Sequence, residues 1–407
     1  MLKLFKKNVS FSLFSLTFLF ALISAFLIFQ ISQGMNFDKH LVLLAERFIH
    51  WKIALLPDQY LPLGDIADYY SNFYLFYGPV PSLLLMPFAT IWGKDFPQAY
   101  LGVGSMIASF VAVYHLSKTF KFNATDSLWL SLFFVFSTVL YAAGLINVTA
   151  YQVQALGVPL ILFALLEYFT KKRPLIIGLF LGLALLTRAV LVLSLIFFLV
   201  EFLQKRLTKK QLILLFIPVV LCGVIFGLYN QRRFHSFFNT GYSYATSLNN
   251  YPISHNMEFG FTSMRHIPAN LYSLLIMPPE PVREDTHGFV LKFPYLKANP
   301  WGMALWFTSP LFLLLVFKFK KGKYTLSSLV TAGSLLAPLL VYFSIGFAQF
   351  GYRYTLDFLP FLFLLLLPTF NGKLTKLAIL LIILGVVFNS LYITSLWGIY
   401  PHFGLHL

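Results

Sequence analysis

Long apolar segments recur along the chain and alternate with short, mostly basic segments. A helix of about 20 apolar residues crosses the ~30 Å hydrocarbon core of a bilayer, and this pattern therefore predicts a series of transmembrane helices. The single-crossing segments are residues 9–31, 97–117, 127–143, 151–168, 211–229, 301–317, 326–347, 355–368 and 377–397.

The apolar run at residues 174–203 requires two crossings. It has basic residues at both ends, at 171–173 and at 205–210. Because Lys and Arg are enriched in cytoplasmic loops, both ends face the cytoplasm. We therefore expect a tight hairpin of two short, tilted helices that turns near Thr187 and Arg188. The same rule, applied along the chain, predicts about eleven transmembrane helices, with the N-terminus in the cytoplasm and the C-terminus outside.

Two long polar loops fall on the outer side, at residues 32–96 and 230–300. In the first loop, residues 38–49 carry apolar positions at helical spacing and predict an amphipathic helix on the outer surface. Residues 80–92 are apolar but short and proline-rich, which favours an interfacial or re-entrant helix. The predicted fold is all-α and polytopic: one transmembrane domain over residues 1–407, without a separate soluble domain.

Composition agrees with a membrane protein. The chain has 407 residues, of which 58% are hydrophobic and only 11% are charged, whereas soluble domains carry about 25% charged residues. The net charge of +16 comes mostly from the short basic loops, so we expect no nucleic-acid partner. The single cysteine, Cys222, excludes an intrachain disulfide and a cysteine-based zinc site.

Acidic residues in the first loop are candidates for chemistry. Asp38 follows the first span closely, and it acts either as a catalytic carboxylate or as the cap of the amphipathic helix. Asp65, Asp68 and Asn72 share one face if their stretch is helical. Asp65 and Asp68 would then form a metal or acid–base site. The alternative is that this stretch is a solvated turn.

Arginines on the outer side suggest an anion. Arg188 lies at the predicted hairpin turn, Arg232 and Arg233 follow the span at 211–229, and Arg353 lies at the outer end of another span. A guanidinium grips phosphate by paired hydrogen bonds, although an arginine here can also reach to lipid headgroups. Taken together, these sites predict binding of a lipid-linked phosphate.

The sequence contains no phosphate-binding Walker loop, no dinucleotide-binding glycine motif and no serine-hydrolase elbow. The histidines show no metal-binding spacing, so we assign no metal ligands.

The chain resembles the GT-C superfamily of integral membrane glycosyltransferases, which includes protein mannosyltransferases and bacterial transferases that modify lipid A and polysaccharides. The resemblance covers most of the length. It rests on the order of several short segments: Asp38, Asp65, residues 74–87, residues 178–188, residues 230–234 leading to Thr240-Gly241-Tyr242, Asn299-Pro300-Trp301-Gly302, and Gly351-Tyr352-Arg353-Tyr354.

The resemblance implies transfer of a sugar from a polyprenyl-phosphate carrier to an acceptor hydroxyl on a glycan, lipid or protein, at the outer face of a bacterial inner membrane. It implies that Asp38 is the general base, with Asp65 as the alternative because Lys39 stands where a second acidic residue is common. Arg188, Arg353, Arg232 and Arg233 would hold the donor phosphate, and Tyr74, Tyr77 and Tyr242 would contact sugar or acceptor. A divalent metal remains open, since only some relatives use one.

Two other functions compete with this interpretation. A flippase or transporter of lipid-linked sugars would use the same arginines, but it predicts ionisable residues at mid-membrane and two similar halves. A polymerase or ligase of surface polysaccharide would also take lipid-linked sugars, with a different plan of loops.

Overall fold

The computed structural model describes residues 2–34, 38–57, 65–249, 253–284, 288 and 290–396. The first half of the chain contains α1 (Leu2–Gly34), α2 (His40–Ile49), β1 (Ile66–Tyr69), β2 (Asn72–Leu75), α3 (Val80–Trp92), α4 (Ala99–Thr119), α5 (Ala124–Phe136), α6 (Leu140–Leu145), α7 (Thr149–Phe169), α8 (Pro174–Leu185) and α9 (Leu195–Leu203). The second half contains α10 (Lys209–Phe234), α11 (Ile253–Met257), α12 (Ile267–Leu275), β3 (Glu280–Arg283), β4 (Leu291–Lys297), α13 (Leu305–Thr308), α14 (Leu313–Phe317), α15 (Thr325–Leu340), α16 (Leu359–Leu366) and α17 (Lys376–Ser395).

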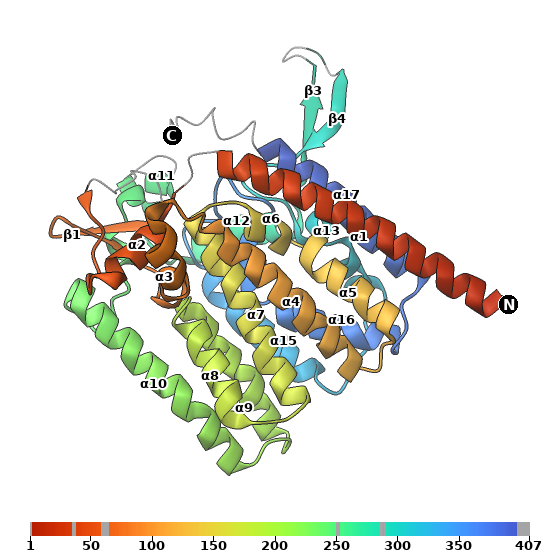
Figure 1. Cartoon of the computed structure of the whole chain (residues 1–407), viewed down its shortest axis with the longest axis horizontal. Helices are drawn as coiled ribbons and strands as arrows, with labels where there is room; N and C mark the ends of the chain where they lie inside the picture. Colours follow the sequence, from red (N-terminus) through yellow and green to blue (C-terminus); the bar gives the residue numbers. More distant parts are fainter. Residues whose placement is uncertain are drawn as a thin grey trace.

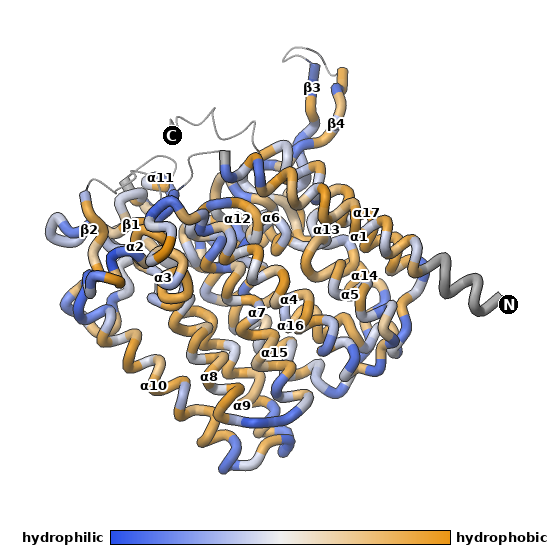
Figure 2. Tube along the Cα trace, in the orientation of Figure 1, coloured by the Kyte–Doolittle hydropathy of each residue, from blue (hydrophilic) through white to orange (hydrophobic). Residues whose placement is uncertain are grey.

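Five helices are long and apolar enough to cross a membrane: Phe11–Gln33 within α1, and the whole of α4, α7, α10 and α17. Shorter apolar helices lie between them in the same layer (Figure 1). Helix α7 is central, since 83% of its apolar window is buried against 22% for that of α1. It packs against α4 and α8, and α8 packs in turn against α10. Figure 2 shows the hydrophobic helical layer with hydrophilic segments at its two ends.

A separate layer of short elements covers one end of the helices. It contains α2, α3 and the antiparallel hairpin β1–β2, in which Ile66 pairs with Leu75 and Tyr69 with Asn72. One face of α2 and the inner positions of the hairpin form a small apolar core of their own, and α2 packs on α3. The segments that the sequence assigns to the first outer loop thus form one packed unit (Figure 1).

The described chain is mostly helical, as expected of an all-α fold, but it contains two short hairpins that the sequence did not predict. Besides β1–β2, the strands β3 and β4 form a second hairpin, which projects beyond the rest of the chain (Figure 1). Both hairpins lie in the long loops, where no 3.6-residue apolar repeat imposes a helix. Asp68 and Asn72 lie on paired strands, so the helical face proposed for Asp65, Asp68 and Asn72 does not exist.

The apolar run at 301–317 is also not one continuous helix. It is divided into α13, a 3-10 turn at Pro310–Phe312 and α14. Proline has no amide hydrogen to donate to the preceding turn, so Pro310 begins a new segment rather than continuing the old one.

The hairpin predicted within residues 174–203 is confirmed. Helix α8 ends at Leu185, and the chain resumes as a 3-10 helix at Ala189–Ser194 that leads into α9. Arg188 lies in the turn, with its backbone extended. The turn therefore brings Arg188 to the end of the helices that carries the first loop.

Gly78 allows the first loop to touch this turn. A Cβ built on Gly78 would lie 1.8 Å from the backbone oxygen of Leu186, and the amide of Val80 donates to that same oxygen at 3.3 Å. Only a residue without a side chain permits this approach, so Gly78 fixes how the first loop sits over the α8 turn.

We predict that Gly78→Ala destabilises the protein by roughly 1–3 kcal/mol, because the added methyl group must displace backbone. The midpoint of thermal unfolding in detergent measures this effect. Gly104→Ala in α4 is the matched control, since a Cβ there meets no atom within 4 Å. Equal midpoints for the two variants would contradict the account of the contact.

Candidate functional site

The site begins where the first loop meets the N-terminus of α7. Helix α7 starts after Val148, whose side chain cannot accept a hydrogen bond, so the first amides of the helix need acceptors from elsewhere. Asp38 provides one: its Oδ1 accepts from the amide of Thr149 at 2.7 Å and also from the Thr149 hydroxyl. A carboxylate also interacts favourably with the positive end of a helix dipole.

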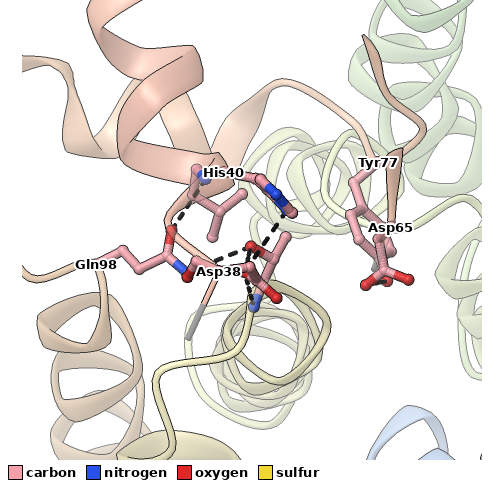
Figure 3. A network of polar contacts seen from close by, with 7 residues as sticks. Asp38, His40, Asp65, Tyr77 and Gln98 are labelled. Atoms are coloured by element: carbon pink, nitrogen blue, oxygen red, sulfur yellow. Dashed lines mark hydrogen bonds and ion pairs between the residues drawn. The ribbon is translucent and has the colours of Figure 1, made fainter. Parts of the chain in front are cut away.

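Gln98, just before α4, closes the arrangement. Its Nε2 donates to the backbone oxygen of Asp38 at 2.8 Å, and its Oε1 accepts from the amide of Leu41 at 3.0 Å. Asp38 is thereby held between α2, α4 and α7 (Figure 3). The interpretation of Asp38 as the cap of its own helix is wrong, because Lys39 occupies the N-cap of α2 and the amide of Leu41 donates to Gln98 instead.

Burial raises the pKa of Asp38 to about 6, against the opposing hydrogen bonds from Thr149 and Gln98. Within the described part of the chain, its hydrogen bonds all end on Oδ1, and none reaches Oδ2. The side chain keeps 9% of its surface accessible. Asp38 therefore offers one carboxylate oxygen without a donor, and the pKa of the carboxyl lies close to neutral pH.

His40 lies beside Asp38, with Nδ1 3.7 Å from Oδ1. The ring is fully buried, and neither of its nitrogens has a hydrogen-bond partner. Burial lowers the pKa of His40 to about 4, so the ring is neutral at neutral pH. The carboxylate of Asp38 therefore has a neutral ring next to it rather than a positively charged counter-ion.

Asp65 lies close to Asp38, immediately before β1. Its Oδ2 accepts from the hydroxyl of Tyr77 at 2.8 Å. Burial raises the pKa of Asp65, the charge of Arg353 lowers it, and the charge of Asp38 raises it again. Asp68 is not part of this group: it is exposed and accepts from the amide of Ser71 at the hairpin turn. Asp65 and Asp68 therefore do not form the metal or acid–base pair that the sequence suggested.

Two arginines face the same region from the helical layer. Arg188 makes an ion pair with Asp357, with Nη2 3.2 Å from Oδ2. Arg353, at the start of the 3-10 turn Arg353–Asp357, donates to Oε1 of Gln154 at 3.3 Å. Its Nε meets no hydrogen-bond partner in the part of the chain that the structure describes.

Arg353 lacks a direct counter-ion. Among the described residues, no carboxylate oxygen lies within the 4.0 Å ion-pair distance of its guanidinium. Asp65 and Asp357 act on it electrostatically from beyond that distance, and the rings of Tyr151 and Tyr354 have centroids 5.5 and 5.2 Å from the guanidinium carbon. A partly buried guanidinium with unused donors is suited to bind an anion.

Tyr77 and Tyr242 complete the group. Tyr242 packs on Phe76 with ring centroids 4.1 Å apart, next to Tyr77. Burial raises the pKa of Tyr77 well above its usual value, with Asp65 adding to the rise and Arg353 and Arg188 opposing it. Burial also raises the pKa of Tyr242, opposed by Arg188. Both hydroxyls therefore lie within electrostatic range of Asp65 and Arg188.

The structure thus brings together six residues singled out from the sequence, which we name the outer polar cluster: Asp38, Asp65, Tyr77, Arg188, Tyr242 and Arg353.

Three other predicted site residues lie elsewhere. Arg233 is 1% exposed, and its two terminal nitrogens donate to the backbone oxygens of Leu75 and Tyr77 and to Asn230, so they hold the end of β2. Arg232 is exposed on the neighbouring face of α10. Tyr74 is buried and packs edge-on against Phe234. These contacts assign Arg233 and Tyr74 to packing of the first loop, not to phosphate and sugar.

Sequence reasoning missed Gln98, Thr149, His40 and Asp357. Thr149 could have been found from the sequence, since it begins an apolar helix directly after Asn147 and Val148. Gln98 and Asp357 carried none, because each acts on a partner far away in the chain. Among the described residues, no group of three or more His, Cys, Asp or Glu is placed to hold a metal ion.

We predict that Arg233→Gln lowers the free energy of unfolding by roughly 1–3 kcal/mol, because it leaves buried carbonyl oxygens without donors. The neighbouring change Arg232→Gln should have little effect, since that side chain is exposed. Thermal unfolding in detergent compares the two. Equal stability of both variants would show that Arg233 does not hold the end of β2.

Comparisons with known proteins give no family for this chain. No family model matches it, and neither a curated protein nor a solved structure matches it.

Proposed function

We propose that this protein is a membrane glycosyltransferase that moves a sugar from a polyprenyl-phosphate carrier to an acceptor hydroxyl on the outer face of a bacterial inner membrane. The observation that carries the proposal is that one cluster around Asp65 contains both Asp38, whose Oδ2 meets no donor among the described residues, and Arg353, which has no carboxylate oxygen within ion-pair distance. This transfer needs a base for the acceptor and a cation for the departing phosphate.

The proposed topology has eleven crossings in a GT-C-like arrangement. The five long helices and the five shorter apolar ones supply ten, and the broken segment at 305–317 supplies the other. The basic loops at 171–173, 205–210 and 318–323 then face the cytoplasm, as does the N-terminus, and the layer with α2 and α3 faces outward. The outer polar cluster lies at the boundary between that layer and the helices.

The chemistry follows from the cluster. Oδ2 of Asp38 takes the proton of the acceptor hydroxyl while the acceptor oxygen attacks the anomeric carbon of the sugar. The bond from that carbon to the phosphate oxygen breaks, and polyprenyl phosphate leaves with the electron pair. Arg353, with Arg188 released in part from Asp357, balances the charge on the phosphate. Tyr77 and Tyr242 offer hydroxyls and ring faces to the sugar, and Asp65 orients Tyr77.

We predict that Asp38→Asn lowers transfer by about 10²–10⁴-fold, because the amide cannot accept the proton. Asparagine keeps an oxygen for the Thr149 amide, so the midpoint of thermal unfolding should stay near that of the wild type. The assay follows transfer from polyprenyl-phosphate sugars in proteoliposomes. Asp68→Asn, at the exposed turn, is the control and should retain activity.

Full transfer by Asp38→Asn would exclude Asp38 as the base. Movement of the lipid-linked sugar across the bilayer, with no transfer by the wild type to any acceptor, would favour the flippase.

We predict that kcat/KM falls below pH 6, by about tenfold per pH unit. The pKa of Asp38 is raised to about 6, so protonation removes the base through the window below that value. The Asp65→Asn variant should show the same fall of kcat/KM at acidic pH. The fall should move to slightly lower pH because a negative charge near Asp38 is gone. Activity that stays constant down to pH 5 would contradict the assignment.

A further inference from the structure

A second polar site lies at the other end of α4 and α7. Both helices start at the outer polar cluster, near Gln98 and Thr149, and both have 21 residues. At 1.5 Å per residue each is about 30 Å long, the thickness of the hydrocarbon core. Their far ends, at Thr119 and Phe169, therefore lie at the opposite headgroup level.

A pocket of about 360 Å³ opens at this level. It is lined by the end of α4, the end of α7, the start of α15 and the turn after α16, with Lys121 and Lys323 as its charged residues. No lining residue is acidic. Among the described residues, neither lysine is in an ion pair, and both are exposed. The pocket thus presents two unpaired positive charges.

The floor of the pocket is apolar and aromatic. The rings of Phe169 and Tyr324 have centroids 4.8 Å apart, and Phe120 lies 5.3 Å from Phe169. The ammonium of Lys323 lies 5.4 Å from the centre of the Tyr324 ring. The backbone oxygen of Lys121 packs near Gly372, which helps to fix that lysine's loop.

The surroundings add to the positive charge. Carboxylates at this end are already engaged: Glu167 accepts from Arg173 at 2.8 Å, Glu201 accepts from Arg206 at 2.8 Å, and Asp126 accepts from Asn123 and the amide of Leu374. Lys118, Lys320 and Lys373 lie in the flanking segments. An anion in the pocket therefore meets attraction without a competing carboxylate.

We propose that this pocket binds the phosphate headgroup of an anionic phospholipid of the inner leaflet. The two lysines contact the phosphate, and the apolar floor receives the first part of the lipid chains. The combination of cationic rim and apolar floor at headgroup depth is what separates a lipid from a soluble phosphate. This proposal does not depend on the glycosyltransferase activity.

The test uses the full chain in detergent and measures binding of short-chain phosphatidylglycerol by native mass spectrometry. Lys121→Gln/Lys323→Gln should lower the affinity roughly thirtyfold, as expected for two lysines at a membrane surface. Lys209→Gln/Lys210→Gln removes two exposed lysines from the start of α10, outside the pocket, and should leave the affinity unchanged.

Two further ligands distinguish the alternatives. Phosphatidylcholine should bind at least tenfold more weakly than phosphatidylglycerol, because its headgroup carries no net charge. Inorganic phosphate should not displace the lipid at millimolar concentration. The proposal is overturned if the two double variants bind phosphatidylglycerol equally, if phosphatidylcholine binds as well, or if inorganic phosphate displaces the lipid.

Discussion

The arrangement of the first loop over the helical layer depends on one interaction, the capping of α7 by Asp38. Helix α7 is the most buried of the long helices, and its first residues have no acceptor of their own. Asp38 supplies that acceptor from a loop 111 residues earlier in the chain. The bond fixes where the first loop lies, and hence where α2, the β1–β2 hairpin and Tyr77 sit over the helical layer. The same carboxylate thus caps the helix through Oδ1, while Oδ2, which meets no donor among the described residues, is the base in the proposed reaction.

This double use explains why the cluster contains so many buried polar groups. A capped helix start gives a carboxylate a stable place, while the surrounding protein raises its proton affinity. Asp357 pairs directly with Arg188, whereas Arg353 has an amide contact, aromatic rings and only more distant carboxylates. Among the described residues, the cluster therefore keeps one arginine without a direct ion pair and one carboxylate oxygen without a donor, which is costly unless a ligand uses both.

The sequence predicted where most of the apolar helices lie, because a long apolar run favours a helix that is able to cross a membrane. It placed the helix break at Arg188 and the helix at Val80–Trp92 where they occur. It failed for the β1–β2 and β3–β4 hairpins, whose strands are short and pair only locally. It could not separate Arg233 from Arg188 and Arg353, since the difference lies in partners: Arg233 meets the carbonyl oxygens at the end of β2, over 150 residues away in the chain. The role of Gln98 was invisible for the same reason.

The most direct test of the account is a structure of the full chain in a lipid nanodisc with polyprenyl phosphate bound. The account predicts that the phosphate lies within hydrogen-bonding distance of Arg353 and Arg188, with Oδ2 of Asp38 facing the space beside it. A phosphate bound far from Arg353, or an Asp38 whose two oxygens are both taken up by protein donors, would contradict the central claim.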